Sequence, residues 1–347
     1  MEDLRQDVYD PFVRGPFAVG VRTVEALDAA RGRRFPCEIW YPAAALGEGR
    51  DSPPEIRDAP SLPGRWPLIL FSHHSSGHRR AATYLTTHLA SHGYVAGALD
   101  HSEVTAPELA HKDGETAEQR EARVDAWVGS RVPDVRYLLD YLLEHAGLDA
   151  ETKLDEGAIG IVGHSLGGWT ALAATEEEPR IRAVVALAPG GSDRPRPGII
   201  PGRLTFRWGR DVPTLYLAAE MDTPIPLDKI YELFERTPAS KAMVVLGRSD
   251  HLHFIDDVEK QHEAVRAMAW SGVLAYLPQE MRPMAELCSG EQAHLFVRGL
   301  ALGHLDAVLR GNEAARRFLA GDIESELARR GVDGWVHRPL THAAPPA

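Results

Sequence analysis

Eight short apolar runs, separated by polar or glycine- and proline-containing stretches, limit the fold of this chain more than any other feature of its sequence. Each run has the length and the branched or apolar side chains of a buried β-strand. The runs cover residues 17–24, 36–41, 67–71, 94–99, 158–162, 183–187, 213–218 and 242–246. We therefore predict a sheet of eight strands.

Amphipathic segments of helical length lie between the later runs. Val135, Leu138 and Leu142 recur at intervals of three and four, which places them on one face of a helix. Residues 81–91 and 166–176 follow the same pattern. Alternating strands and helices predict an α/β fold with a mainly parallel sheet covered on both faces, and the first two runs, with no helix between them, predict an antiparallel pair.

Two stretches depart from this alternation. Residues 102–132 are rich in charge, and residues 190–212 carry several prolines beside Phe206 and Trp208. Insertions in such sheets tend to lie above the carboxyl ends of the strands, where ligands bind. We expect at least one of the two stretches to form a lid or a pocket wall; solvated connections are the alternative.

After about residue 280 the pattern becomes wholly helical, with helices predicted at 293–309 and 313–319. An isolated pair of helices has little apolar surface to bury. We therefore predict an α/β domain over residues 1–280 and a C-terminal helical extension, residues 281–347, that packs on it.

The charge balance excludes several classes of partner. The 38 Lys and Arg residues against 50 Asp and Glu give a net charge of −12, which repels phosphate backbones and anionic membranes. The first residues lack the basic and apolar regions of a secretory signal, and no window approaches a membrane span in apolar length. We expect no nucleic-acid partner, no membrane insertion and a cytoplasmic location, with Cys37 and Cys288 as free buried thiols.

The strongest chemical signal is at residues 163–168, which read GHSLGG. The motif follows one of the apolar runs directly and leads into a helical segment. A serine between glycines at such a junction fits a strained strand-to-helix turn that exposes its hydroxyl. Ser165 is therefore the candidate nucleophile; the alternative is a glycine-rich turn with an idle serine.

A serine nucleophile needs a base that is itself oriented by a carboxylate. In this type of fold the partners follow in the order serine, acid, histidine, after later strands. Asp222 follows the seventh apolar run and His251 follows the eighth. Glu220 competes as the acid and His253 as the base, and the two histidines are also weak candidates for a metal site; we favour Asp222 and His251.

Acyl transfer also requires backbone donors for the oxyanion. We expect the N–H of Leu166, which follows the nucleophile, and the N–H of Ser75, from the loop after the third run. That loop contains His73, His74 and His78, but no carboxylate or thiol accompanies them. We predict neither a metal nor a cofactor.

Four residues are candidates for the substrate pocket: His74, Trp169, Phe206 and Trp208. Trp169 follows the serine motif closely, and Phe206 and Trp208 lie in the second insertion. Aromatic side chains in pockets are less common than aromatic side chains in cores, so core packing is the alternative.

Together these motifs resemble the α/β-hydrolase superfamily, and most closely its dienelactone-hydrolase-like and platelet-activating-factor-acetylhydrolase-like serine esterases. Beside GHSLGG, the resemblance rests on four segments that occur in the family's order and read GPFAVG (15–20), FPCEIWYP (35–42), LILFSH (68–73) and LASHGYV (89–95). It covers roughly residues 15–275.

The resemblance implies an eight-stranded, mainly parallel sheet, a triad of Ser165, Asp222 and His251, and an oxyanion hole formed by Ser75 and Leu166. Two positions depart from the family pattern. The family usually has glycine where this chain has His74, and dienelactone hydrolases proper use a cysteine nucleophile where this chain has serine. The serine implies ester hydrolysis rather than lactone opening in particular.

We therefore predict a carboxylic-ester hydrolase that acts on a small-molecule ester through an acyl-enzyme intermediate, as a monomer or homodimer. Two alternatives stay open: an amidase, peptidase or thioesterase with the same triad, and a non-catalytic ligand-binding protein on the same fold.

Overall fold

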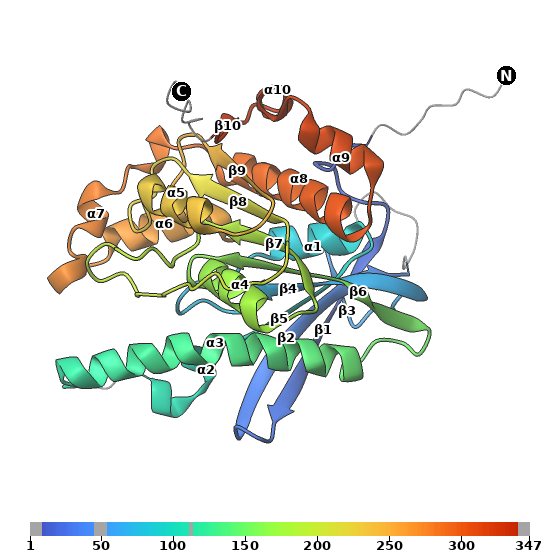
Figure 1. Ribbon diagram of the computed structural model, residues 1–347, viewed down its shortest axis with the longest axis horizontal. Helices are drawn as coiled ribbons and strands as arrows, with labels where there is room; N and C mark the ends of the chain where they lie inside the picture. The colour runs from blue at the N-terminus through green and yellow to red at the C-terminus, as the bar shows by residue number, and fades with distance from the viewer. Residues whose placement is uncertain (1–8, 45–53, 111–113, 339–347) are drawn as a thin grey trace, which may run out of the picture.

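The computed structural model describes residues 9–44, 54–110 and 114–338. Its strands are β1 (Ala18–Asp28), β2 (Arg33–Ala43), β3 (Ile56–Arg57), β4 (Gly64–Ser72), β5 (Val95–Leu99), β6 (Thr152–His164), β7 (Ile181–Leu187), β8 (Thr214–Ala219), β9 (Lys241–Leu246) and β10 (Gly334–Val336). Within the described residues they form one 10-stranded sheet in the order β10-β9-β8-β7-β6-β4-β5-β2-β1-β3 (Figure 1). All eight predicted strands are present.

The six strands β4 to β9 run parallel. Their side chains are buried along most of their length, because helices cover both faces of this part of the sheet. β1 and β2 pair antiparallel, as their short connection requires, and β2 pairs antiparallel with β5. The carboxyl ends of the parallel strands therefore share one edge of the molecule.

The helices are α1 (Thr83–Ser91), α2 (Ser102–Thr105), α3 (Ala117–His145), α4 (Leu166–Glu177), α5 (Leu227–Arg236), α6 (Val258–Ala267), α7 (Leu277–Glu280), α8 (Gly290–Leu309), α9 (Glu313–Ala320) and α10 (Ile323–Ala328). α1 and α8 pack on one face of the sheet, and α3 and α4 pack on the other. None of the helices within the described ranges is long and apolar enough to cross a membrane.

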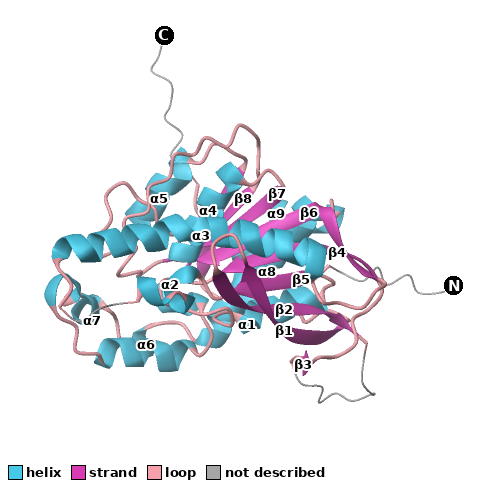
Figure 2. Ribbon diagram, turned by 90° about the horizontal axis from the view of Figure 1, so that it is seen from below, coloured by secondary structure: helices cyan, strands magenta, loops and turns pink. Residues whose placement is uncertain are grey.

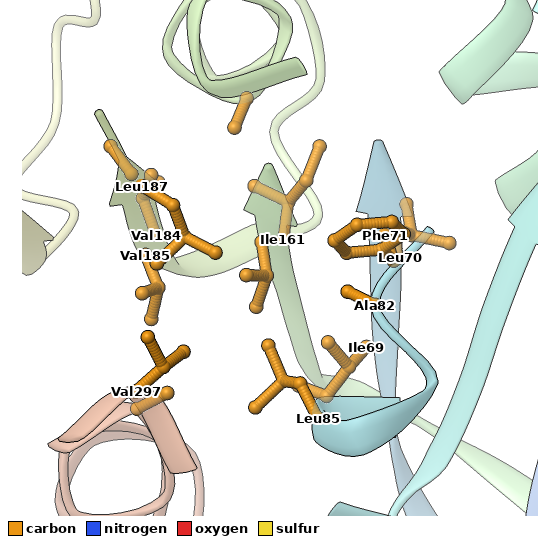
Figure 3. Packing of buried hydrophobic residues seen from close by; sticks show 14 of the residues in the cluster. Ile69, Leu70, Phe71, Ala82, Leu85, Ile161, Val184, Val185, Leu187 and Val297 are labelled. Carbon is orange, nitrogen blue, oxygen red and sulfur yellow. The ribbon is translucent and has the colours of Figure 1, made fainter. Parts of the chain in front are cut away.

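The core lies between these layers. Figure 3 shows apolar side chains of β4, β6 and β7 packed between α4 on one side and α1 and α8 on the other. The labelled residues include Ile69, Leu70, Ile161, Val184, Leu85 and Val297, all at most 1 % exposed. Each such aliphatic side chain contributes about 1.5–3 kcal/mol on burial. Cys37 and Cys288 are free and buried, as predicted.

Helix α3 is much longer than the sequence pattern indicates. It begins at Ala117, where Thr116 and Gln119 form a capping box, and it continues through Pro133 to His145. Most side chains before residue 130 are exposed, so this half has no apolar stripe that could have revealed it. Figure 2 shows α3 crossing the sheet and extending past it, so the insertion at 102–132 is mainly helix.

The segment after residue 280 packs against the sheet and shares its core. α8 packs directly on the sheet and buries Phe296, Val297 and Leu300 completely. β10 then pairs with the edge strand β9 and extends the sheet. The segment after residue 280, predicted as a helical extension that packs on the α/β domain, therefore supplies one covering layer of the core and the strand β10.

Candidate active site

Ser165 stands at the turn between β6 and α4 in a conformation that most residues avoid. Its φ is 57° and its ψ is −117°, and the glycines around it make this turn sterically feasible. A Cβ on Gly163 would lie 2.0 Å from the Gly167 carbonyl oxygen, and a Cβ on Gly167 would lie 1.9 Å from that of Ser72. The turn therefore holds the Ser165 hydroxyl at the carboxyl edge of the sheet.

His251 and Asp222 come from the loops after β9 and β8 and meet Ser165 at this edge. Ser165 Oγ lies 2.8 Å from His251 Nε2, and His251 Nδ1 lies 2.7 Å from Asp222 Oδ2. A carboxylate only accepts hydrogen bonds, so Nδ1 carries the proton and Nε2 is free to accept the serine proton. The N–H of Ile225 donates to the other Asp222 oxygen at 2.7 Å and fixes the carboxylate.

The electrostatics of this pair favour a basic imidazole. Burial lowers the pKa of His251, but the charge and hydrogen bond of Asp222 outweigh it and raise the pKa above 6.5. Burial raises the pKa of the Asp222 carboxyl, and His251 opposes that rise. The Asp222 side chain is 0 % exposed and the His251 side chain is 13 % exposed, so only the histidine is open to solvent.

The two competing residues lie elsewhere. Glu220 is exposed, and its carboxylate accepts the N–H of Arg248 at 2.7 Å. His253 is fully buried, and its Nδ1 lies 3.0 Å from Asp250 Oδ1. Neither takes part in the hydrogen-bonded chain that begins at Ser165.

His253 belongs to a buried charged cluster that sequence reasoning missed. Asp250 lies between two imidazoles, 3.0 Å from His253 Nδ1 and 2.7 Å from His262 Nδ1. The outer nitrogens of the rings donate to the carbonyls of Cys288 and Arg282. Burial lowers the pKa of His253, but Asp250 raises it to about 10. The cluster thus ties the loop that carries the triad histidine to the segment before α8.

The two backbone N–H groups expected to bind the oxyanion have no acceptor among the described residues. Leu166 is the first residue of α4, where an N–H has no partner within the helix. The loop after β4 turns at Ser76, with φ 55°, and the Gly77 N–H donates to the His74 carbonyl. Neither the Leu166 N–H nor the Ser75 N–H donates to an acceptor in the described part of the chain. Both expected oxyanion donors are therefore available.

An apolar and neutral wall lies behind His251. The ring of His164 is 4.8 Å from that of His251 and 5.6 Å from that of Phe254, and His74 packs 5.6 Å from His164. Burial lowers the pKa of His74 to about 3, and it lowers the pKa of His164 well below 6.5. Both rings are neutral at pH 7. His74 thus lies beside the triad, whereas sequence reasoning had assigned no role to His164.

Trp169 lies one turn into α4 but is only 6 % exposed. Its indole N–H donates to the Arg203 carbonyl at 3.4 Å, and its ring packs under Gly202. Trp169 therefore packs against the second insertion.

Phe206 and Trp208 are placed away from the triad, which corrects their assignment to the pocket. The hydroxyl of Thr205 and the N–H of Arg207 both bind the carboxylate of Glu176. Glu176 is in the last turn of α4, whereas Ser165 precedes its first turn. Trp208 is 5 % exposed and packs with Phe206 on the core.

Among the described residues, no side chains at this edge are arranged as a metal site. In the ranges that the structure describes, no group of three or more His, Cys, Asp or Glu side chains is arranged to hold a metal ion. The nearby cations Arg79 and Arg80 are engaged in ion pairs, Arg79 with Glu38 and Asp100, and Arg80 with Glu38 and Glu55.

Comparison with known proteins finds a matching family profile. The profile of the family described as "PETase: PET hydrolase-like" matches residues 76–298, a range that contains Ser165, Asp222 and His251. The chain is 25% identical over 223 residues to cutinase est1 of Thermobifida alba, covering 63% of this chain and 64% of that protein, which is less than two thirds of its length. It is 23% identical over 266 residues to the bis(hydroxyethyl) terephthalate hydrolase of Streptomyces coelicolor, covering 75% of this chain and 72% of that protein.

Among solved structures, a ferulic acid esterase from Streptomyces cinnamoneus is similar with a TM-score of 0.62 and 22% identity. The likeness covers 88% of this chain and 93% of the other. At this identity the likeness shows the fold.

Proposed function

We propose that this chain, which belongs to the PET hydrolase-like family and has the α/β-hydrolase fold, hydrolyses carboxylic esters. The observation that carries the proposal is the continuous hydrogen-bonded chain from Ser165 through His251 to Asp222. It supplies a nucleophile, a base and an orienting carboxylate at hydrogen-bond distance from one another.

In the proposed first half-reaction, His251 Nε2 takes the hydroxyl proton as Ser165 Oγ attacks the ester carbonyl. The positive charge that forms on the imidazole is stabilised by Asp222 at 2.7 Å. The oxyanion accepts the N–H groups of Leu166 and Ser75. His251 then gives its proton to the departing alcohol, leaving an acyl group on Ser165.

In the second half-reaction the same imidazole activates water, which attacks the acyl carbonyl and releases the acid. The neutral rings of His74 and His164 suit this role, because a second imidazolium beside His251 would oppose its protonation. The cycle restores the protein without any further group.

A relative supports an ester as the substrate class. The bis(hydroxyethyl) terephthalate hydrolase is named for an ester, which favours an ester over an amide or thioester. We propose a small-molecule carboxylic ester as the substrate. The narrower assignment to the dienelactone-hydrolase-like branch is part of this proposal and rests on the sequence motifs alone.

The test compares the wild type with Ser165→Ala on p-nitrophenyl esters of increasing acyl length, bis(hydroxyethyl) terephthalate and a ferulate ester. Matched amides and thioesters separate the bond types. We expect ester turnover in the wild type and a loss of about 10⁴-fold or more in Ser165→Ala. Ser130→Ala, on helix α3, is the control. Wild-type turnover in Ser165→Ala, or a preference for the amide, would overturn the proposal.

A further inference from the structure

Helix α3 carries a completely buried arginine to the back of the oxyanion loop. Arg131 is 0 % exposed, and it reaches two successive carbonyls of that loop. Its Nη1 donates to the His73 carbonyl at 2.6 Å and its Nη2 donates to the His74 carbonyl at 3.1 Å. An ion pair with Glu103 of α2 holds the guanidinium in place.

The side chain of His73 is a further donor to the His74 carbonyl. The N–H of His101 donates to His73 Nε2 at 3.1 Å, so Nε2 is an acceptor and the ring proton is on Nδ1. Burial lowers the pKa of His73 well below 6.5, which keeps this ring neutral. His73 Nδ1 then donates to the His74 carbonyl at 2.6 Å. With the Gly77 N–H at 3.0 Å, that carbonyl accepts from three groups.

The direction of the Ser75 N–H follows from the peptide bond that joins it to the His74 carbonyl. The His74 carbonyl and the Ser75 N–H belong to one peptide plane, and no peptide bond in the described ranges is cis. In a trans peptide the two groups point in opposite directions. Because the carbonyl is held toward Arg131, the Ser75 N–H is directed away from the helix, and it has no acceptor among the described residues.

We propose that Arg131 is a positioning residue for ester hydrolysis, which aims and polarises the Ser75 N–H as the second donor of the oxyanion hole. The inference rests on the proposed ester hydrolysis and goes beyond it. A cation on the carbonyl side of a peptide strengthens the N–H on the other side as a donor. N–H donors that already point at the oxyanion position need no reorganisation during the reaction, so no free energy is spent on orienting them.

The burial of a charge at this point supports a role beyond packing. Replacing a buried ion pair by apolar residues of similar volume is often neutral or stabilising, so stability alone gives little reason for Arg131 and Glu103. A planar guanidinium reaches two carbonyls at once, whereas a lysine ammonium is a single point charge on a flexible stem. The two terminal nitrogens of Arg131 each bind one of the two carbonyls, those of His73 and His74.

Three variants test the proposal. Arg131→Met combined with Glu103→Gln removes the cation without leaving an unpaired buried carboxylate. Arg131→Lys keeps the charge but loses the fork. Arg136→Met, on the same helix, is the matched control, because the Arg136 side chain is 49 % exposed and lies at more than 3.5 Å from its partners.

The readouts are kcat and KM on a p-nitrophenyl ester, the pH profile, and inhibition by a trifluoromethyl ketone. That ketone forms a tetrahedral adduct with the serine, whose oxyanion occupies the hole. We expect kcat to fall about 10- to 100-fold in the double variant and less in Arg131→Lys, with little change in KM. The affinity for the ketone should fall by the same factor as kcat/KM, and the pH midpoint should stay constant.

A merely structural role would lower the thermal midpoint without this parallel loss. If the double variant does not fold, Arg131→Lys decides, because an unchanged kcat and ketone affinity in that variant would overturn the proposal. Failure of the underlying function is distinguishable, since it shows as ester turnover that persists in Ser165→Ala. If Ser165→Ala loses ester turnover as expected while the Arg131 variants keep wild-type kcat and KM, only the positioning role is overturned.

Discussion

Ser72 Oγ lies 2.8 Å from His101 Nε2, the same distance that separates Ser165 Oγ from His251 Nε2. His101 Nδ1 in turn lies 3.3 Å from Asp134, so the molecule holds a second serine, histidine and carboxylate in sequence. Ser72 and Asp134 are 0 % exposed and His101 is 1 % exposed. No substrate can reach this second set, and it joins the end of β4 to helix α3 as part of the structure.

This difference in access predicts which serine reacts. A fluorophosphonate probe should label the wild type and Ser72→Ala, and it should fail to label Ser165→Ala. Ser72→Ala should lose about 1–3 kcal/mol of stability, because His101 keeps a buried nitrogen without its partner. Mass spectrometry of the labelled peptide and a denaturant titration check the two statements. Labelling of Ser165→Ala that disappears in Ser72→Ala would reverse the assignment of the two sets.

The pH dependence of the reaction follows from the Asp222–His251 pair. The imidazole must be neutral to accept the serine proton, and Asp222 raises its pKa above 6.5. The ratio kcat/KM should therefore fall as the pH drops through that raised pKa and should level off above it. In Asp222→Asn the midpoint should move down and kcat should fall about 10⁴-fold, since the orienting charge is lost.

Glu220→Gln is the control for this profile, because Glu220 lies two residues away in the chain and contacts the Arg248 backbone instead. Its midpoint and kcat should match the wild type. A profile that responds to Glu220→Gln and not to Asp222→Asn would show that the wrong carboxylate has been assigned.

The Asp250 cluster predicts how stability changes with pH. The pKa of His253 is raised from 6.5 to about 10 in the folded protein. Its contribution to stability is complete below pH 6.5 and is lost as the pH rises toward 10. The free energy of unfolding should therefore decline over this range in the wild type. In Asp250→Asn it should be lower by about 3–5 kcal/mol at pH 7 and should decline less, because the partner of the buried imidazoles is gone.

Denaturant titrations between pH 6 and pH 10 measure both effects. Asp228→Asn serves as the control, because the Asp228 side chain is 67 % exposed and its pair with Lys229 is a surface pair. Equal pH slopes in the wild type and Asp250→Asn would exclude the cluster as the source of the decline.

The strands and the triad could be predicted because their signals are local. Apolar runs, the GHSLGG turn and the order of Ser165, Asp222 and His251 all follow from short stretches read along the chain. Their meeting at one edge follows from the parallel sheet. The choice of Asp222 over Glu220 was a prediction about loop reach, and the structure places Asp222 at the histidine.

The rest depends on contacts between distant segments. Arg131 and His101 are single polar residues with no motif around them, and their partners come from other elements. Phe206 lies in the predicted insertion. Its neighbours Thr205 and Arg207 bind Glu176, so Phe206 lies near the C-terminal end of α4. The cytoplasmic location and the oligomeric state stay predictions.

The segment after residue 280 should be necessary for stable folding, because α8 covers one face of the sheet. A chain that ends at residue 280, the boundary expected from sequence, lacks α8 and with it the completely buried side chains of Phe296, Val297, Leu300, Leu302 and Leu305. At about 1.5–3 kcal/mol each, their loss amounts to roughly 10 kcal/mol, which is comparable to the ~5–15 kcal/mol net stability of a typical domain. It also exposes the face of β6 and β7 that α8 covers. We expect this chain to lack a cooperative unfolding transition and to bind an apolar dye, whereas the full-length chain should unfold cooperatively. Differential scanning calorimetry of the two proteins decides, and a cooperative transition in the chain ending at 280 would show that the core does not need the segment after residue 280.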